Sequence, residues 1–186
     1  MSKSSKNKLI IGMAARMTND KRQDIIIDMV HSNKNFFIKK NIFFSLIGIG
    51  LSLEKHQRYV TENGLKKIIS MPGYLDEKKI IEWFKNLDIY VHISDDETTS
   101  TSILQAMSMS LPIICSEVDG NRMLNKNNNL LIVPNNKKKI FIKLKYLLNN
   151  QKIRNKIGKN ARKIVETHYN AENLFDKYLK FIFSDK

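Results

Sequence analysis

The chain has 186 residues, which is enough for one domain with its own hydrophobic core. Its formal charge is +14 and its isoelectric point lies near 9.8, which would suit nucleic acid, an anionic membrane surface or a phosphorylated ligand. The basic residues are spread over the chain without interleaved aromatic side chains or a nucleic-acid-binding motif. We therefore expect diffuse surface charge and no nucleic-acid partner.

The cysteine and histidine content excludes several kinds of site. A single cysteine, Cys115, rules out a disulfide within the chain and fits a reducing compartment. The four histidines show no metal-ligand spacing, so we expect no metal and no other cofactor. His92 lies within an apolar segment and is interpreted as a core or pocket-rim residue. The longest nearly apolar run, residues 42–53, is too short to span a bilayer.

The opening residues are polar and basic and lack the apolar segment of a secretory signal. We expect residues 1–8 to form a disordered tail and residues 9–186 to form one folded domain. The prediction is a cytoplasmic protein. Peripheral contact with the inner face of the membrane stays open.

At the start of the folded region, the first predicted strand ends at a basic residue and the first predicted helix begins at one. Residues 9–15 predict a buried strand that ends at Arg16, and a helix with an apolar inner face is predicted from Lys21. An arginine at a strand end and a lysine at the next helix start can converge on one phosphate group. Cations are, however, also common at strand ends that bind nothing.

Two further strands lead into turns that contain glycine. Residues 42–47 predict a strand followed by Gly48-Ile49-Gly50, where backbone can approach a ligand closely, although the third glycine of a dinucleotide site is absent. Residues 68–71 predict a strand that leads into Pro72-Gly73-Tyr74. Helices are predicted over residues 53–63 and 76–86, the second with Asp76 as its N-terminal cap.

The central stretch, residues 88–120, predicts a strand, a polar loop, a helix from Ile103, a second strand and a turn. The loop contains Asp95, Asp96 and Glu97 followed by hydroxyl side chains. In an open parallel sheet, ligands bind at the carboxyl ends of strands, and a helix start there offers free N–H groups to an anion. The alternative is that the acidic side chains only solvate a loop, while Ser100 or Thr101 caps the helix.

The remainder predicts a strand over residues 130–133 and helices over 137–149, 151–167 and 171–183. Strands that alternate with helices indicate a Rossmann-like α/β domain, with a parallel sheet of about six strands and helices on both faces. The final helix carries more apolar side chains than one docking face requires. We expect it to cover a partner surface, with local packing into the core as the alternative.

The central stretch resembles the donor-binding motif of retaining GT-B glycosyltransferases of the glycogen-synthase and sucrose-synthase-like superfamily (glycosyl transferases group 1, family 4 type). That motif is a glutamate, seven residues, a second glutamate, Ala-Met, a small residue and Gly-x-Pro. The matching residues here are Glu97, Gln105, Ala106-Met107 and Ser110-Leu111-Pro112. The turn Glu117-Val118-Asp119-Gly120 is similar to the family's Asp-Val-Gly-Gly.

The start of the domain is similar to the family's Gly-Arg-x-x-x-x-Lys-Gly, whose cations grip the donor diphosphate. Arg16 and Lys21 fit this pattern, while Ala15 and Arg22 replace its glycines. The family also has a Gly-x-Gly after its next strand, and it places backbone near the nucleobase where this chain has Gly73-Tyr74. The resemblance covers nearly the whole chain from Leu9, but only the carboxy-terminal, donor-binding half of a GT-B enzyme.

This resemblance implies transfer of a sugar from a nucleoside-diphosphate sugar to an unknown acceptor, with retention and without a metal, in cell-surface polysaccharide or glycolipid synthesis. The implied catalytic residues are Arg16, Lys21 and Glu97. The implied substrate-binding residues are Gly48, Gly50, Gly73, Tyr74, Thr98, Thr99, Ser100, Thr101 and Gln105. A separately encoded amino-terminal half is the expected protein partner. Because Gln105 replaces the second glutamate, the alternative is a non-catalytic nucleotide-sugar-binding or regulatory module, or an inactive fragment.

Overall fold

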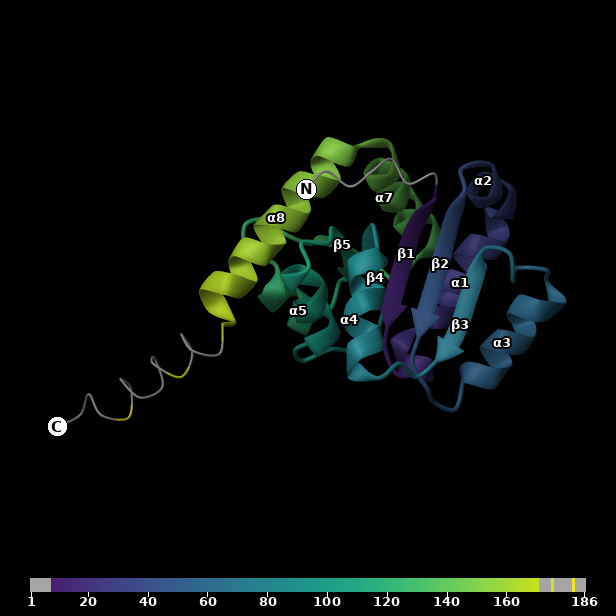
Figure 1. The fold of residues 1–186 in the computed structure, drawn as a ribbon, viewed down its shortest axis with the longest axis horizontal. Coiled ribbons are helices and arrows are strands. Elements are labelled where there is room, and N and C mark those ends of the chain that lie inside the picture. Colours follow the sequence, from purple (N-terminus) through teal and green to yellow (C-terminus); the bar gives the residue numbers. More distant parts are fainter. Residues whose placement is uncertain (1–7, 171–174, 176–181, 183–186) are drawn as a thin grey trace.

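The computed structural model describes residues 8–170, 175 and 182. Its centre is a six-stranded sheet in the order β3-β2-β1-β4-β5-β6, and every pair of neighbouring strands is parallel (Figure 1). The strands are β1 (Leu9–Ala14), β2 (Ile42–Ile47), β3 (Ile69–Gly73), β4 (Ile89–His92), β5 (Ile113–Ser116) and β6 (Leu131–Val133). The predicted Rossmann-like parallel sheet is confirmed.

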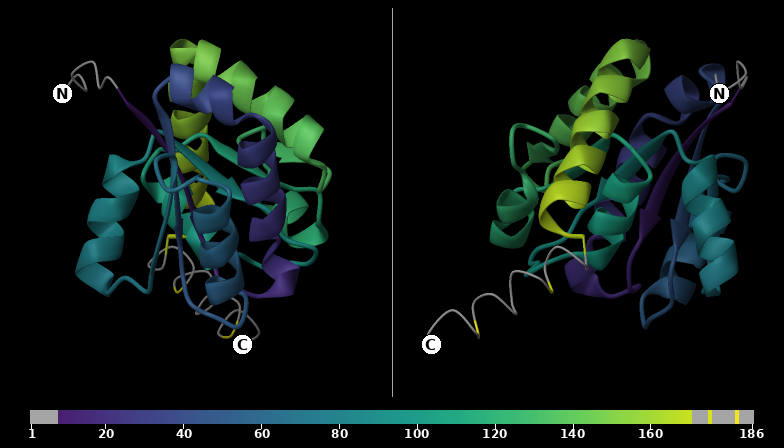
Figure 2. Two further views of the ribbon diagram at one scale, coloured as in Figure 1. Left: turned by 90° about the vertical axis from the view of Figure 1, so that its right-hand side faces the viewer. Right: turned by 60° about the vertical axis from the view of Figure 1, so that its left-hand side comes forward.

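Helices cover both faces of this sheet (Figure 2). One face packs against α1 (Gln23–Ser32), α2 (Lys34–Lys39), α3 (Leu53–Glu62) and α7 (Lys137–Asn149). The other face packs against α4 (Glu77–Asn86), α5 (Thr101–Ser108), α6 (Asp119–Leu124) and α8 (Gln151–His168). Each face has its own hydrophobic core.

Alternate side chains of each strand supply the two cores, as strands buried on both faces require. On β4, Ile89 and Val91 enter the first core, whereas Tyr90 enters the second, which lies under α4 and α5. His92 follows Tyr90 by two residues, so its side chain points to the same face, toward the start of α5. The strand period therefore brings a histidine to the carboxyl end of the sheet beside α5.

The structure corrects two local predictions and adds one helix. The helix expected from Lys21 is instead a 3₁₀ turn over Asn19–Lys21, and α1 begins only at Gln23 because Arg22 adopts left-handed backbone with φ of 45°. Helix α2 was not predicted. The turn expected over residues 117–120 is partly the first turn of α6. All three segments are short and are held by contacts distant in sequence.

The predicted tail and final helix fall, except for Lys8, Phe175 and Ile182, outside the described residues. Among the helices of the described part, none is both long and apolar enough to cross a membrane.

Candidate functional site

A cavity of about 610 Å³ opens at the carboxyl ends of the strands. It lies where the strand order reverses, between β1 and β4, which is the usual ligand position in a doubly wound sheet. Its volume falls within the range typical of small-molecule sites. The lining residues are Ala14, Ala15, Arg16, Lys21, Ile47, Gly48, Tyr74, Leu75, Ile80, His92, Glu97, Thr99, Ser100, Thr101, Ser102 and Gln105.

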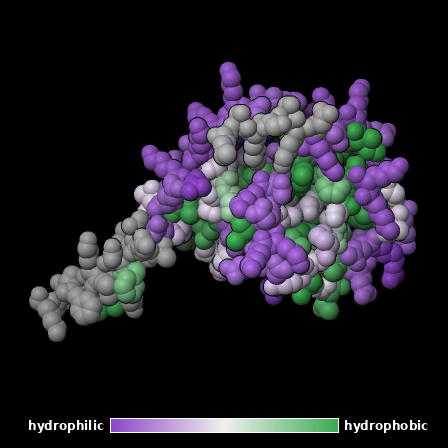
Figure 3. Space-filling model, viewed as in Figure 1, coloured by the Kyte–Doolittle hydropathy of each residue, from purple (hydrophilic) through white to green (hydrophobic). Residues whose placement is uncertain are grey.

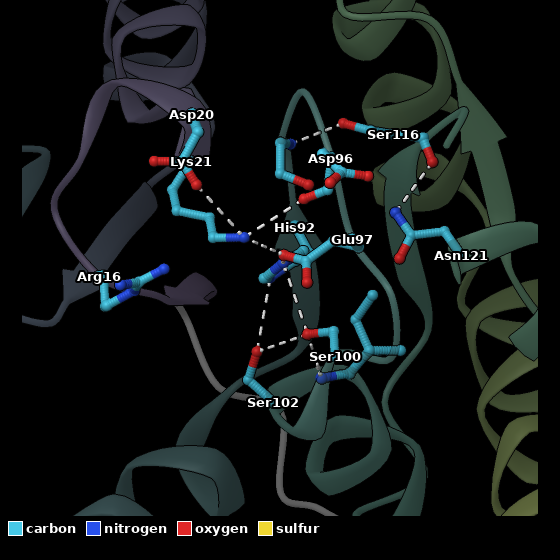
Figure 4. Close-up of polar contacts among 12 residues, drawn as sticks. Arg16, Asp20, Lys21, His92, Asp96, Glu97, Ser100, Ser102, Ser116 and Asn121 are labelled. Atoms are coloured by element: carbon cyan, nitrogen blue, oxygen red, sulfur yellow. Dashed lines mark hydrogen bonds and ion pairs between the residues drawn. The ribbon is translucent and has the colours of Figure 1, made fainter. Parts of the chain in front are cut away.

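The loop after β1 supplies both cations of the cavity. The buried side chain of Gln23 donates a hydrogen bond from Nε2 to the Arg16 carbonyl at 2.8 Å, and the Met17 amide donates to the Ile49 carbonyl at 2.8 Å. These bonds fix the backbone on which Arg16 projects. Figure 4 shows its guanidinium on the opposite side of Lys21 from the loop that carries Glu97. Among the described residues, the Arg16 side chain has no hydrogen-bond or ion-pair partner.

Glu97 lies at the centre of the polar cluster in Figure 4. Its Oε1 accepts hydrogen bonds from His92 Nε2 at 2.6 Å and from Lys21 Nζ at 2.8 Å. Lys21 also reaches the Asp96 carbonyl at 3.3 Å. The Glu97 side chain is only 11 % exposed, and burial alone would raise its pKa. The hydrogen bonds and charges of His92 and Lys21 outweigh burial and lower the pKa of Glu97 to about 2, so Glu97 is a carboxylate at neutral pH.

The start of α5 faces the same cavity. Ser100 caps this helix, because its hydroxyl accepts the Ile103 amide at 3.4 Å. The amides of Thr101 and Ser102 belong to the first turn and have no intrahelical acceptor, so they can bind an anion. Gln105 lines the cavity one turn further along.

The loop after β4 is held on both sides. The Asp95 carboxylate pairs with Arg22 Nη1 at 3.0 Å and accepts from Asn135 Nδ2 at 2.9 Å, while the Asp95 amide donates to the Asp20 carbonyl at 2.8 Å. The alternative of acidic side chains that only solvate a loop is therefore wrong for Asp95 and for Glu97. Their contacts hold the loop over the cavity.

Three glycines permit close approaches between loops. An added Cβ at Gly48 would lie 1.9 Å from the Ala15 carbonyl oxygen, and one at Gly50 would lie 2.5 Å from that of Met17. The Gly-x-Gly segment is thus required by packing between the loops after β1 and β2. Similarly, a Cβ at Gly120 would lie 2.1 Å from the Glu97 carbonyl oxygen, which accepts the Gly120 amide at 3.0 Å.

Two positions where the resembled family has glycine carry other residues in left-handed backbone. Arg22 has φ of 45° and Ser110 has φ of 58°. The backbone at both positions thus takes the conformation that glycine adopts most readily, although the side chains differ.

The structure brings most of the sequence-predicted site residues together. Nine of the twelve line the cavity, whereas Gly50, Gly73 and Thr98 do not. His92, Ser102, Leu75 and Ile80 also line it and were not predicted as ligand-binding. The sequence could have indicated His92 as a site residue, because it is a polar residue at the carboxyl end of an apolar strand, five positions before Glu97.

Other features of the described chain do not form a comparable site. A concavity of about 630 Å³ lies between α1 and α3, and acidic and basic side chains are mixed in its lining, among them Asp24, Glu54, Lys55 and Arg58. Within the described residues, no group of three or more histidine, cysteine or acidic side chains could hold a metal ion.

Comparison with known proteins gives a consistent result. The family profile described as "Glycosyl transferases group 1" matches residues 2–164. The poly(ribitol-phosphate) alpha-N-acetylglucosaminyltransferase of Staphylococcus aureus is 24% identical over 176 residues, which are 91% of this chain and 34% of that enzyme. This chain thus spans about a third of the length of that curated relative.

Two solved structures share the fold. Anabaena HepE, solved in complex with UDP and glucose, superposes with a TM-score of 0.84 at 18% identity and covers 97% of this chain and 49% of its own. The C-terminal domain of a glycosyl transferase group 1 family protein (LpcC) from Francisella tularensis gives a TM-score of 0.77 at 24% identity, with 88% and 87% covered. The fold is that of the carboxy-terminal domain of a GT-B enzyme, and the chain belongs to the glycosyl transferases group 1 family.

Proposed function

We propose that this chain binds the nucleoside-diphosphate sugar of a retaining glycosyltransferase, which transfers the sugar to an acceptor in cell-surface polysaccharide or glycolipid synthesis. One observation carries the proposal. Arg16, Lys21, the first amides of α5 and the Glu97 carboxylate all converge on one cavity. These groups match the two halves of a nucleotide-sugar, an anionic diphosphate and a sugar rich in hydroxyl groups.

The diphosphate would be held by the cationic side of the cavity. Arg16 lines the cavity and has no ion-pair partner in the described part of the chain, and the amides of Thr101 and Ser102 offer neutral donors at the positive end of a helix. Lys21 is 14 % exposed and already paired with Glu97, so the diphosphate would share or take over this cation. All of these groups would stabilise negative charge on the departing diphosphate as the bond to the sugar breaks.

Glu97 would act on the sugar. Among the described residues both of its hydrogen bonds reach Oε1, and Oε2 receives none. Oε2 can therefore accept sugar hydroxyl groups or stabilise positive charge that develops at the anomeric carbon. Gln105, further along α5, would hold ribose hydroxyls through its neutral amide.

The names of related proteins support the substrate class. HepE was solved with UDP, which supports a uridine nucleotide as the first probe. One S. aureus relative is named for poly(ribitol-phosphate) and another for capsular polysaccharide biosynthesis, which supports a polymer as the final product. An amino-terminal half, encoded separately or in the same chain, would supply acceptor contacts.

A second candidate function is a non-catalytic nucleotide-sugar-binding or regulatory module. The observation that favours it is Gln105, because an amide at this position loses the charge-assisted hydrogen bonds that a glutamate makes. Binding without turnover, in the presence of the proposed partner half and acceptor, would identify this case. An inactive fragment would bind no nucleotide-sugar.

Peripheral contact with an anionic membrane is the remaining part of the proposal. Between Lys137 and Lys163 the chain holds nine lysines, two arginines and no acidic residue, and α7 and most of α8 fall in this range. Helix α7 also exposes Ile142 and Tyr146 between lysines, and Figure 3 shows hydrophilic residues over α8. Binding to phosphatidylglycerol vesicles but not to phosphatidylcholine vesicles in co-sedimentation would support this contact.

Titration calorimetry with UDP and a panel of UDP-sugars tests the central proposal. The wild-type chain should bind both, and Arg16→Ala should weaken UDP binding at least tenfold, because a charge-assisted hydrogen bond is worth roughly 1.5–3 kcal/mol. Arg58→Ala is the matched control, since Arg58 is exposed on α3 and does not line the cavity. Equal UDP affinity of all three proteins would remove the phosphate site.

A further inference from the structure

His92 is a buried polar residue in a strand that is otherwise apolar. Its side chain is 2 % exposed, and its Nε2 lies 2.6 Å from Glu97 Oε1. An apolar residue would pack at this position without the cost of burying a polar ring. The contact with Glu97 is the one short hydrogen bond that His92 makes in the described chain, so the energetic reason for the histidine lies in that carboxylate.

The positions of the hydrogens on the His92 ring follow from the atoms that the ring contacts. Because the Glu97 carboxylate can only accept, His92 Nε2 must carry the hydrogen of this bond. On the other side of the ring, Nδ1 lies 3.4 Å from the Tyr90 hydroxyl and 3.5 Å from the Ser102 hydroxyl. The Tyr90 hydroxyl has one hydrogen, which it donates to the Ala14 carbonyl at 3.1 Å. Ser102 is therefore the group that can donate to Nδ1.

Two donors thus hold the same oxygen of Glu97 from different elements. His92 approaches Oε1 from β4 and Lys21 approaches it from the turn after β1, which leaves Oε2 unengaged among the described residues. Lys21 is the partner that a diphosphate would compete for, whereas His92 is buried and stays on Glu97. The orientation of the carboxylate after donor binding then depends on His92.

We propose that His92 is a positioning residue that fixes the Glu97 carboxylate and so directs Oε2 toward the sugar. This inference rests on the proposed nucleotide-sugar function. His92 should therefore affect binding of the sugar part of the donor and not binding of its nucleotide.

The test compares affinities for UDP and for the best-binding UDP-sugar by calorimetry. His92→Leu should weaken UDP-sugar binding about tenfold and leave UDP binding within twofold of wild type. His92→Gln keeps a donor near Nε2 and should recover most of the loss. Ile93→Val is the matched control, because Ile93 directly follows β4 and packs in the opposite core, so this variant changes a neighbouring buried side chain without changing the contacts of Glu97.

A measurement without ligand checks the hydrogen bond itself. In ¹⁵N-NMR spectra at neutral pH, His92 should show a protonated Nε2 whose signal shifts in Glu97→Gln. An unshifted His92 signal in Glu97→Gln would overturn the hydrogen bond between His92 and Glu97. This result does not depend on ligand binding.

The two proposals fail in different ways. A wild-type chain that binds neither UDP nor any UDP-sugar overturns the nucleotide-sugar function and this inference with it. A wild-type chain that binds both, with a ratio of the two affinities unchanged in His92→Leu, overturns the positioning role alone. If His92→Leu weakens both affinities equally, His92 has only a structural role, and this result also overturns the positioning role.

Discussion

Lys21 Nζ lies 2.8 Å from Glu97 Oε1, and this ion pair joins the loops that follow β1 and β4 across 76 residues of sequence. Both side chains are largely buried, at 14 % and 11 % exposure. Removal of Lys21 would leave His92 as the donor to the Glu97 carboxylate, and removal of Glu97 would leave Lys21 with Asp20 at 3.5 Å. The two edges of the cavity are thus coupled before any ligand binds.

The first prediction concerns the pH dependence of stability. The folded-state pKa of Glu97 is about 2, below its unfolded value, so its contribution to stability is present above the unfolded pKa and is lost as pH falls toward 2. Between pH 5 and pH 3 the free energy of unfolding of wild type should fall by about 2 kcal/mol more than that of Glu97→Gln. Urea unfolding at each pH measures this difference, and parallel curves would contradict it.

The second prediction separates the roles of Glu97 and Gln105. Glu97→Gln should weaken UDP-sugar binding about tenfold and leave UDP binding nearly unchanged, because a neutral amide accepts sugar hydroxyls less strongly. Gln105→Glu should tighten both ligands by several-fold, since ribose is common to them. If the two variants change UDP and UDP-sugar affinity alike, the division of roles is wrong.

The third prediction tests the contact between α6 and the loop that carries Glu97. Gly120→Ala should lower the free energy of unfolding by about 3 kcal/mol, because the new Cβ would meet the backbone oxygens of Glu97 and Thr98 at 2.1 and 2.3 Å. It should also weaken UDP-sugar binding more than UDP binding. Asp119→Ala is the control at an exposed neighbour and should change stability by less than about 0.5 kcal/mol. Equal stability of the two variants would show that the loop yields freely.

The sequence could predict the sheet because each strand is a short apolar run bounded by polar or glycine-containing turns. Strand β2 and helix α7 have the predicted bounds, and Asp76 caps α4 as expected by accepting the Lys79 amide at 2.9 Å. These features depend on neighbours in sequence, which are visible in a one-dimensional pattern.

The features that were missed depend on partners distant in sequence. Helix α2 has six residues, which is too short for a periodic signal, and its buried Phe37 packs on Phe141 of α7. The role of His92 depends on the loop geometry that brings Glu97 back over β4. The sequence predicted Arg16 at a strand end, Lys21 at a helix start and Glu97 in a loop after a strand. Only the fold shows that Lys21 is already paired with Glu97.

The last prediction concerns Ser110, which follows α5 at the position where helices commonly end in a left-handed glycine. The Leu111 amide donates to the Ala106 carbonyl at 3.1 Å and the Ser110 amide to that of Met107 at 2.9 Å, which is the Schellman pattern. With φ of 58°, serine is strained there, so Ser110→Gly should raise the free energy of unfolding by about 1 kcal/mol. Ser108→Gly, inside the same helix, should lower it by about 0.5–1 kcal/mol. Urea unfolding of both variants decides: a loss of stability in Ser110→Gly as large as in Ser108→Gly would mean that chain entropy outweighs the strain.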